Sequence, residues 1–205
     1  MKKHHHNLLL IFTRNPELGK CKTRLAAKVG DATALAIYKF LLSHTVAITT
    51  DLKAAKQVYY SEYKGENDIW DDTIFEKVVQ DGEDLGVRMA NAFTAGFNAG
   101  YRNIIVIGSD VYDLSKEDLE KAFAALNTND YVLGPAEDGG YYLLGMRTFT
   151  PELFKNKSWG TETVLEATMQ DLQGEQIALL EQRNDVDRYE DIKDIEAFQP
   201  FLKNV

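Results

Sequence analysis

The chain has 205 residues, of which 44% are hydrophobic and 27% charged, and its formal net charge is -9. This composition is typical of a globular protein and excludes a disordered chain. The acidic net charge argues against a broad basic surface for nucleic acid or an anionic membrane. We interpret residues 1–205 as one domain, in which residues 1–7, with the histidine tract at 4–6, form a disordered, solvated or engineered end.

Basic side chains are concentrated at the start of this acidic chain. The first 28 residues contain seven Lys or Arg residues and one acid, whereas the other 177 contain 16 basic and 31 acidic residues. A local basic cluster on an acidic body is typical of a site for a small polyanion such as a nucleotide. The single cysteine, Cys21, excludes an internal disulfide and fits a cytoplasmic protein. No apolar run approaches the roughly 20 residues of a membrane helix, so we expect no membrane insertion.

The hydrophobic pattern predicts strands and helices that alternate along the chain. Expected strands lie at 8–12, 57–60, 74–80, 104–108, 130–134, 141–146 and 176–180. Expected helices lie at 24–50, 85–99, 116–126 and 161–172, and a last one begins near Asp187. This order builds βαβ units, so we predict an α/β fold with a mainly parallel sheet between two layers of helices. Ligands bind beyond the carboxyl ends of the strands in such sheets, which points to the loops 13–23, 108–114 and 135–140.

The segment FTRNPELGKCKTRL follows the first expected strand and opens a helix, where backbone N–H groups attract phosphate. Its charged and loop-shaping residues are Arg14, Gly19, Lys20, Lys22 and Arg24. It is not a P-loop, because Arg14 and Cys21 stand where that motif needs Gly and Ser or Thr. We therefore predict a phosphate site built from basic side chains. The alternative is a solvated helix start with surface lysines.

An acidic turn, Gly-Ser-Asp, ends the most apolar expected strand. Asp110 comes first after that strand and faces the predicted basic loop across the sheet edge. The carboxylate oxygens of Asp110 are hard ligands, which suit a Mg²⁺ or Mn²⁺ ion that bridges diphosphate oxygens. The alternative is an aspartate that only closes its own turn, which is a common role of Asp and also fits Asp113.

The segment GPAEDGGYYLLG joins two apolar runs. Asp138, Gly139 and Gly140 form a strong hairpin-turn signal, and paired glycines also let the backbone approach a ligand closely. Glu137 and Asp138 lie at the expected ligand edge, so either acid is a candidate to orient or deprotonate an acceptor.

Local side-chain pairings are also expected. Asp84 and Arg88 are spaced for an ion pair on one helix face. Thr161 stands where a helix N-cap belongs. Trp159 either stacks on a sugar or fills the core, and Gln80 is a candidate contact for a base or ribose.

Six stretches occur in one order over residues 8–192: FTRNPELGKCKTRLA, DGEDLGVRMANAF, IGSDVYDL, VLGPAEDGGYYLLGM, SWGTETVL and NDVDRYEDI. By these stretches the chain resembles the DUF2064, or glycosyltransferase-like, family, which is related to the nucleotide-diphospho-sugar transferases. The resemblance implies a GT-A-like three-layer α/β/α sandwich with a Rossmann-like nucleotide-binding half and a divalent metal. More distantly, the pattern is similar to guanylyltransferases of cofactor biosynthesis and to molybdopterin nucleotidyltransferases.

The resemblance also implies roles for single residues. Arg14, Lys22 and Arg24 match a phosphate-facing motif, Asp110 matches a metal-binding position, and Asp138, Gly139, Gly140 and Tyr141 match a segment near the sugar or acceptor. Asp185 and Asp187 match a D-x-D that supplies a second metal ligand, although Asp187 is equally suited to cap the last helix.

The chain departs from the family pattern at one turn. The family has the motif G-[ST]-D-C-P-D-L after the central strand. In this chain, Val111 and Tyr112 replace its cysteine and proline. Loss of the proline is expected to loosen the turn and the metal geometry, although both aspartates remain.

The leading interpretation is a metal-dependent glycosyltransferase that moves a sugar from a nucleoside diphosphate sugar to an unknown acceptor. The main alternative is a nucleotidyltransferase that releases pyrophosphate from a nucleoside triphosphate. A third interpretation, favoured by the altered turn, is a nucleotide-binding module without catalysis. The expected partners are a nucleotide donor and an acceptor, with no nucleic acid and with a homo-oligomer left open.

Overall fold

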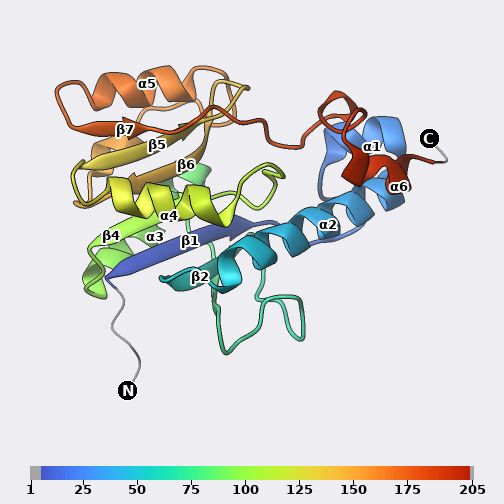
Figure 1. Cartoon of the computed structure of the whole chain (residues 1–205), viewed down its shortest axis with the longest axis horizontal. Coiled ribbons are helices and arrows are strands. Elements are labelled where there is room, and N and C mark those ends of the chain that lie inside the picture. The colour runs from blue at the N-terminus through green and yellow to red at the C-terminus, as the bar shows by residue number, and fades with distance from the viewer. Residues whose placement is uncertain (1–5, 204–205) are drawn as a thin grey trace.

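A computed structural model describes residues 6–203 as one α/β unit built on a seven-stranded sheet (Figure 1). The strands are β1 (Asn7–Thr13), β2 (Ala55–Tyr60), β3 (Glu76–Val79), β4 (Asn103–Ile107), β5 (Tyr131–Pro135), β6 (Tyr141–Met146) and β7 (Ile177–Leu179). Their order across the sheet is β3-β2-β1-β4-β6-β5-β7. Only β6 is antiparallel to its neighbours, β4 and β5, so the sheet is mainly parallel as predicted.

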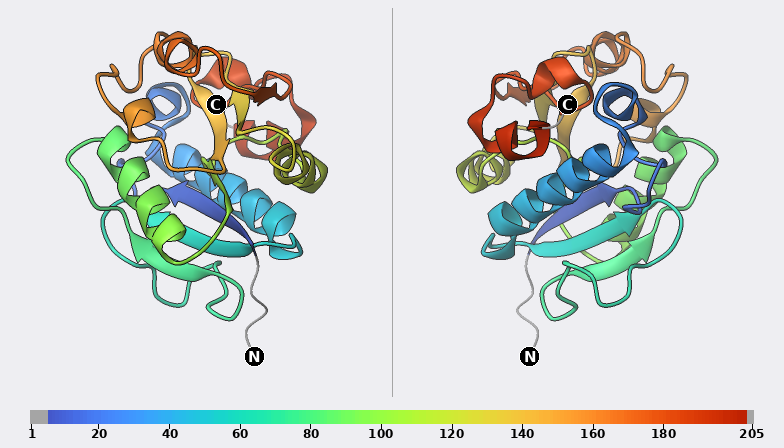
Figure 2. Two further views of the ribbon diagram at one scale, coloured as in Figure 1. Left: turned by 90° about the vertical axis from the view of Figure 1, so that its left-hand side faces the viewer. Right: turned by 90° about the vertical axis from the view of Figure 1, so that its right-hand side faces the viewer.

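Helices cover both faces of this sheet (Figure 2). On one face, α2 (Asp31–Thr50) and α4 (Lys116–Ala125) pack against Leu9 and Ile11 of β1. On the other face, α3 (Leu85–Asn98), a 3-10 helix η1 (Pro151–Phe154) and α5 (Val164–Asp171) pack against Leu8 and Leu10. Successive side chains of a strand point to opposite faces, so the continuous apolar run of β1 serves two cores. The predicted three-layer α/β/α sandwich is therefore confirmed.

A third, smaller core joins the first two helices to the C-terminal segment. It contains side chains of α1 (Thr23–Val29), α2 and the C-terminal segment, which includes η2 (Tyr189–Asp191), η3 (Glu196–Phe198) and α6 (Gln199–Leu202). Phe198 is fully buried there, edge-on to Phe40. Figure 1 shows α1 and α6 side by side at one end of the molecule. This packing carries the segment after β7 back toward β1.

Two helix predictions were wrong. The single helix expected at 24–50 is divided into α1 and α2 at Gly30, whose φ of 83° lies in the left-handed region that glycine favours. The helix expected near Asp187 is instead a series of short turns. The Asp191 carboxylate accepts hydrogen bonds from the Asp187 and Arg188 N–H groups, which closes a tight turn before a helix can propagate.

The first turns of α3 and α5 differ from the predictions made for Asp84, Arg88 and Thr161. Asp84 caps α3 by accepting a hydrogen bond from Val87 N at 2.8 Å, and Arg88 donates instead to Gly82 O and Gln80 Oε1. The predicted Asp84–Arg88 ion pair was therefore wrong. Helix α5 begins at Val164, so Thr161 is not its N-cap, and the Thr161 hydroxyl donates to Ser158 O.

Of the predicted disordered end, residues 1–5 lie outside the described residues. Asn7 already belongs to β1 and pairs with Asn103, so the prediction was wrong for that residue. Among residues 6–203, α2 is the one helix long and apolar enough to cross a membrane by length and composition. Its buried side chains pack against the sheet and the C-terminal segment, as expected of a core helix.

Candidate functional site

A large groove opens at the carboxyl ends of the parallel strands, with a volume of about 1290 Å³. It is lined by the β1–α1 loop, the turn after β4, the β5–β6 connection and the segment after β7. The predicted site residues in its wall are Arg14, Lys20, Lys22, Arg24, Asp110, Glu137, Asp138, Asp185 and Asp187. The fold therefore brings together basic and acidic residues that are separated by more than 150 positions in the sequence.

Lys22 is the most constrained residue of the basic loop. It precedes α1 with φ 51° and ψ 46°, a left-handed conformation that is uncommon and costly for a residue other than glycine. Its side chain is only 8% exposed, and Nζ lies 2.7 Å from Asp110 Oδ2. Burial alone would lower the pKa of Lys22, but the carboxylates of Asp110, Asp185 and Asp187 together outweigh burial and the pKa is raised. The loop thus holds an ammonium group inside the groove.

The other basic residues lie nearer the rim. Arg24 donates to Asp187 Oδ2 at 2.8 Å, and Lys20 pairs with Glu17 at 2.6 Å. In the described part of the chain, the exposed Arg14 has no carboxylate partner. Gly19 turns the loop with φ 72° but does not line the groove. Arg14 is therefore the cation most available to an incoming anion.

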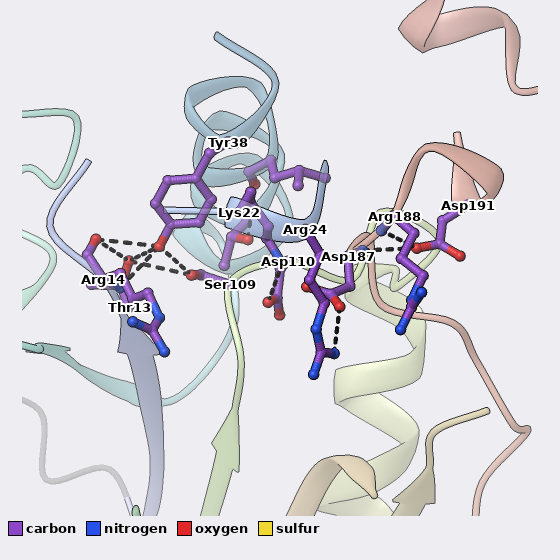
Figure 3. A network of polar contacts seen from close by, with 12 residues as sticks. Thr13, Arg14, Lys22, Arg24, Tyr38, Ser109, Asp110, Asp187, Arg188 and Asp191 are labelled. Carbon is purple, nitrogen blue, oxygen red and sulfur yellow. Dashed lines mark hydrogen bonds and ion pairs between the residues drawn. The ribbon is translucent and has the colours of Figure 1, made fainter. Parts of the chain in front are cut away.

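A buried hydroxyl network that the sequence did not reveal fixes the start of this loop (Figure 3). The Tyr38 hydroxyl, from α2, accepts a hydrogen bond from Arg14 N at 2.9 Å. It also lies 3.0 Å from Thr13 Oγ1 and 3.3 Å from Ser109 Oγ, so it joins the ends of β1 and β4. Burial raises the pKa of Tyr38, which keeps the hydroxyl protonated. Tyr38 is thus a positioning residue for the basic loop.

Gln80, which follows β3, also helps to position the start of the basic loop. Its side-chain amide nitrogen donates to Thr13 O at 3.2 Å and to Tyr59 O at 2.9 Å. Its oxygen accepts from Arg88. These contacts tie three strands together and leave Gln80 little capacity to read a base.

The acidic wall forms where the segment after β7 crosses the end of β4. Val186 N donates to Asp110 O at 3.0 Å, which places Asp185 beside the turn that bears Asp110. Burial, together with the negative charges of Asp110 and Asp138, raises the pKa of Asp185 to about 6. The carboxylates therefore repel one another within the groove.

Asp187 has a different environment from Asp185. Its carboxylate pairs with Arg24, while the adjacent turn is closed by the carboxylate of Asp191. The alternative that Asp187 caps a helix was therefore wrong.

The carboxylates of the groove fit a Mg²⁺ site that is completed by phosphates and water. Among residues 6–203 there is no group of three or more His, Cys, Asp or Glu side chains arranged to hold a metal ion. Mg²⁺, however, is usually bound by one or two carboxylates, with phosphates and water as its other ligands. Asp110 and Asp185, two neighbouring carboxylates that repel each other, match that requirement.

The turn after β4 is held without the family's proline. Val111 is buried in the core between the sheet and α4. The Tyr112 ring packs against Phe40, His44 and Phe198, with centroid distances of 5.7, 5.2 and 4.9 Å. Packing of the two replacing side chains thus anchors the turn that bears Asp110.

The predicted hairpin turn between β5 and β6 is confirmed. Gly140 N donates to Asp138 Oδ1 at 2.8 Å, and Gly139 has a φ of 85°. A Cβ at Gly139 would collide with the Glu162 carbonyl, and Gly139 O accepts from Leu165 N at 2.9 Å. Gly139 therefore packs the turn against the start of α5 rather than lining the groove, and the exposed Asp138 lines it.

A second, smaller cavity of about 270 Å³ adjoins the groove. Asp110, Asp138 and Asp185 line both spaces. The other walls of the small cavity are mostly apolar and come from Phe12, Met89, Val106, Val111, Tyr141 and Trp159, with Gly140 at its edge. Sequence reasoning missed this cavity because its walls come from separate elements that share no local motif.

Comparisons with known proteins support the fold. A family model described as "uncharacterized protein conserved in bacteria (DUF2064)" matches residues 40–161. A crystal structure of a "putative nucleotide-diphospho-sugar transferase" from Desulfovibrio desulfuricans G20 is 30% identical, with a TM-score of 0.84, over 96% of this chain and 94% of that one. The predicted fold relationship is thereby confirmed. No curated protein matches the chain.

More distant structures share the fold. A cytidylyltransferase from Leptospira borgpetersenii is 16% identical, with a TM-score of 0.54, over 92% of this chain and 84% of that one. An inositol-1-phosphate CTP transferase from T. maritima is 14% identical, with a TM-score of 0.53, over 96% of this chain and 95% of that one. At these identities the likeness concerns the architecture alone.

Proposed function

This chain belongs to the DUF2064 family, and on that basis we propose that it transfers a sugar from a nucleoside diphosphate sugar to an acceptor, using Mg²⁺ or Mn²⁺. The fold is one that nucleotide-using transferases share. One observation carries the proposal: a preformed groove in which buried Lys22 and exposed Arg14 face the carboxylates of Asp110 and Asp185. We also propose that the protein is located in the cytoplasm.

The basic loop is proposed to bind the diphosphate. Arg14 offers a guanidinium without a carboxylate partner among the described residues, and its planar fork suits phosphate oxygens. Lys22 and Arg24 are already held in the groove by Asp110 and Asp187. Positive groups fixed in advance stabilise charge on a departing diphosphate without reorganising during the reaction.

Asp110 and Asp185 are proposed to hold the metal ion. When bound, Mg²⁺ or Mn²⁺ would supply positive charge to the diphosphate as it leaves. The positive charge would then relieve the mutual repulsion of the two carboxylates, which adds to burial in raising the pKa of Asp185. Asp187, paired with Arg24, contributes to the position of that arginine.

Asp138 is proposed to orient the acceptor and take its proton. It is exposed, it lines both the groove and the small cavity, and its turn is fixed by Gly140 N. Glu137 lines the groove only, and it is therefore the weaker candidate for this role.

Nucleotidyl transfer is the second candidate, because cytidylyltransferases share the architecture. The two reactions release different products. We would incubate the protein and Mn²⁺ with a panel of nucleoside diphosphate sugars and measure free nucleoside diphosphate. A parallel panel of nucleoside triphosphates and phosphorylated acids would be assayed for pyrophosphate.

The proposal expects release of nucleoside diphosphate, strongly reduced in Asp110→Asn and retained in Glu120→Gln, which changes an exposed acid on α4. Pyrophosphate release without nucleoside diphosphate would instead establish nucleotidyl transfer. Nucleotide binding without either product would indicate a binding module.

A further inference from the structure

We propose that the small cavity beside the groove is the acceptor subsite, and that it takes an uncharged molecule with an apolar ring and a hydroxyl group rather than a phosphorylated compound. The proposal rests on the proposed sugar transfer and names its acceptor class. It starts from the contrast between the two adjoining spaces, which share three aspartates but differ in their remaining walls.

The size and lining of the cavity suit a ring. Its volume of about 270 Å³ exceeds the ~150 Å³ in which an apolar protein cavity binds benzene. The Phe12 ring stacks on Tyr59 with a centroid distance of 5.2 Å, so this wall is fixed. The indole of Trp159 lies against Gly86, where a Cβ would collide with Nε1. The apolar walls are therefore in place before a ligand arrives.

One residue of the cavity wall, Tyr141, has a hydroxyl group that lacks a strong partner. Among residues 6–203, the only hydrogen-bond partner of the Tyr141 hydroxyl is Met89 Sδ at 4.0 Å, and a thioether is a weak acceptor. Burial raises the pKa of Tyr141, so the hydroxyl remains a donor. A ligand oxygen in the cavity would give this donor the partner that a buried polar group requires.

Charge excludes a phosphorylated acceptor. Asp110, Asp138 and Asp185 line the cavity, whereas no Lys or Arg side chain does so in the described part of the chain. The cations of the basic loop line the groove alone. Lys22 and the proposed metal ion are engaged by Asp110, Asp185 and the diphosphate in the groove, so a phosphate in the small cavity would lie beside Asp138 with no lysine or arginine side chain to compensate it.

The arrangement of the two spaces places the donor in the groove and the acceptor in the small cavity. A diphosphate among the basic residues places its sugar toward the aspartates that both spaces share, and the cavity beyond them remains for the acceptor. The acceptor oxygen would form a bond to the anomeric carbon of the sugar as the bond from that carbon to the diphosphate oxygen breaks. The bonding pair leaves with the nucleoside diphosphate, and the acceptor proton passes to the Asp138 carboxylate.

Tryptophan fluorescence can report on this cavity, because one of the two tryptophans, Trp159, lines it and the other, Trp70, is buried elsewhere in the core. We would titrate the full chain with 2-phenylethanol and with 2-phenylethyl phosphate. The expected result is a saturable change with 2-phenylethanol that Trp159→Phe abolishes, and binding of the phosphate ester that is weaker by about tenfold or more.

Two variants test the site assignment. Val164→Phe would fill the cavity from the start of α5, and we expect it to weaken 2-phenylethanol binding by about tenfold. Tyr141→Phe, which removes only the hydroxyl, should weaken it severalfold, whereas Tyr101→Phe, near the opposite ends of the strands, should not. Circular dichroism would confirm that each variant is folded.

Equal or tighter binding of the phosphate ester would overturn the proposal, as would absence of 2-phenylethanol binding or binding that Val164→Phe leaves unchanged. Nucleoside diphosphate sugar binding would be scored separately by thermal shift. A protein that binds such sugars but not 2-phenylethanol contradicts the acceptor class alone. One that binds 2-phenylethanol but no nucleoside diphosphate sugar contradicts the proposed function and leaves the ligand preference of the cavity standing.

Discussion

The groove and the small cavity lie at the same edge of the sheet and share Asp110, Asp138 and Asp185, yet their chemistry differs. The groove is several times larger and contains all four cations of the basic loop. The cavity contains none in the described residues and is mostly apolar. The shared aspartates thus separate a space suited to a charged nucleotide from a space suited to a neutral ring. Substitutions on either side of this division, or among the shared aspartates, would test whether it holds.

The largest effect is expected for Asp110→Asn at the boundary. Loss of the carboxylate should remove metal-dependent nucleotide binding and reduce activity by about 10²–10³-fold, because it removes both a metal ligand and the partner of Lys22. Mn²⁺-dependent calorimetric titration with the nucleoside diphosphate measures this. Asp113→Asn is the matched control, since Asp113 pairs with Arg183 and does not line the groove.

Unchanged Mn²⁺-dependent affinity in Asp110→Asn would move the metal to another position. Unfolding of the variant would be detected in the same samples by circular dichroism.

Asp138→Asn should separate catalysis from donor binding. An amide cannot accept the acceptor proton, so kcat is expected to fall by about 10²-fold while the affinity for the donor changes little. The Gly140 N–H can still donate to the amide oxygen, which preserves the turn. Single-turnover kinetics with saturating donor measure the effect, and Glu137→Gln serves as the comparison. A larger loss in Glu137→Gln than in Asp138→Asn would reverse the two roles.

Lys22→Met tests the groove alone. It removes a buried positive charge and should weaken nucleoside diphosphate binding by about tenfold or more, while 2-phenylethanol binding in the cavity stays the same. Lys28→Met, on the short helix α1 that Lys22 precedes but outside both spaces, is the control. Parallel loss of both ligands in Lys22→Met would show that the two spaces are not independent.

The smallest effect is a gain in stability for Asp185→Asn. The folded protein binds the Asp185 proton more tightly than the unfolded chain, because its pKa is raised from 3.8 to about 6. The free energy of unfolding should therefore fall as the pH rises through this window, and the penalty is complete above about pH 6. Since the side chain is partly exposed, we expect Asp185→Asn to stabilise the protein by about 1–2 kcal/mol at pH 7.5.

Most of this gain should be lost at pH 4, because Asp185 is then protonated in the folded protein and its ordinary pKa of 3.8 leaves it about half protonated in the unfolded chain. Denaturant unfolding at the two pH values measures it, with Asp194→Asn, at an exposed position, as the control. A variant less stable than the native chain at pH 7.5 would contradict the repulsion within the acidic wall.

Much of the fold was predictable because the apolar pattern is strong where the sheet is buried. The run at 104–107 is buried on both faces, and β4 occupies it fully. The pattern failed where a single residue decides the outcome. Gly30 divides a continuous amphipathic pattern into two helices, and the Asp191 carboxylate closes a turn where a helix was expected. Neither effect changes hydrophobic periodicity.

Some residues of the candidate site were also predictable from the sequence, and others were not. The basic loop and Asp110 were predictable because each follows a strand directly, at the edge where ligands bind. Asp185 was found by resemblance, and backbone contacts between distant segments, such as the hydrogen bond from Val186 N to Asp110 O, explain why it lies there. Tyr38 and the apolar cavity were missed because their roles depend on contacts between distant segments. The Tyr38 hydroxyl, for example, meets Ser109 across 71 positions.

The most direct test of the central claim is a crystal structure of the protein with a nucleoside diphosphate sugar and Mn²⁺. The diphosphate should contact Arg14 and Lys22, the metal should lie between it and the carboxylates of Asp110 and Asp185, and the sugar should reach the mouth of the small cavity. A diphosphate bound away from the basic loop, or a nucleotide base inside the apolar cavity, would contradict the division between the two spaces.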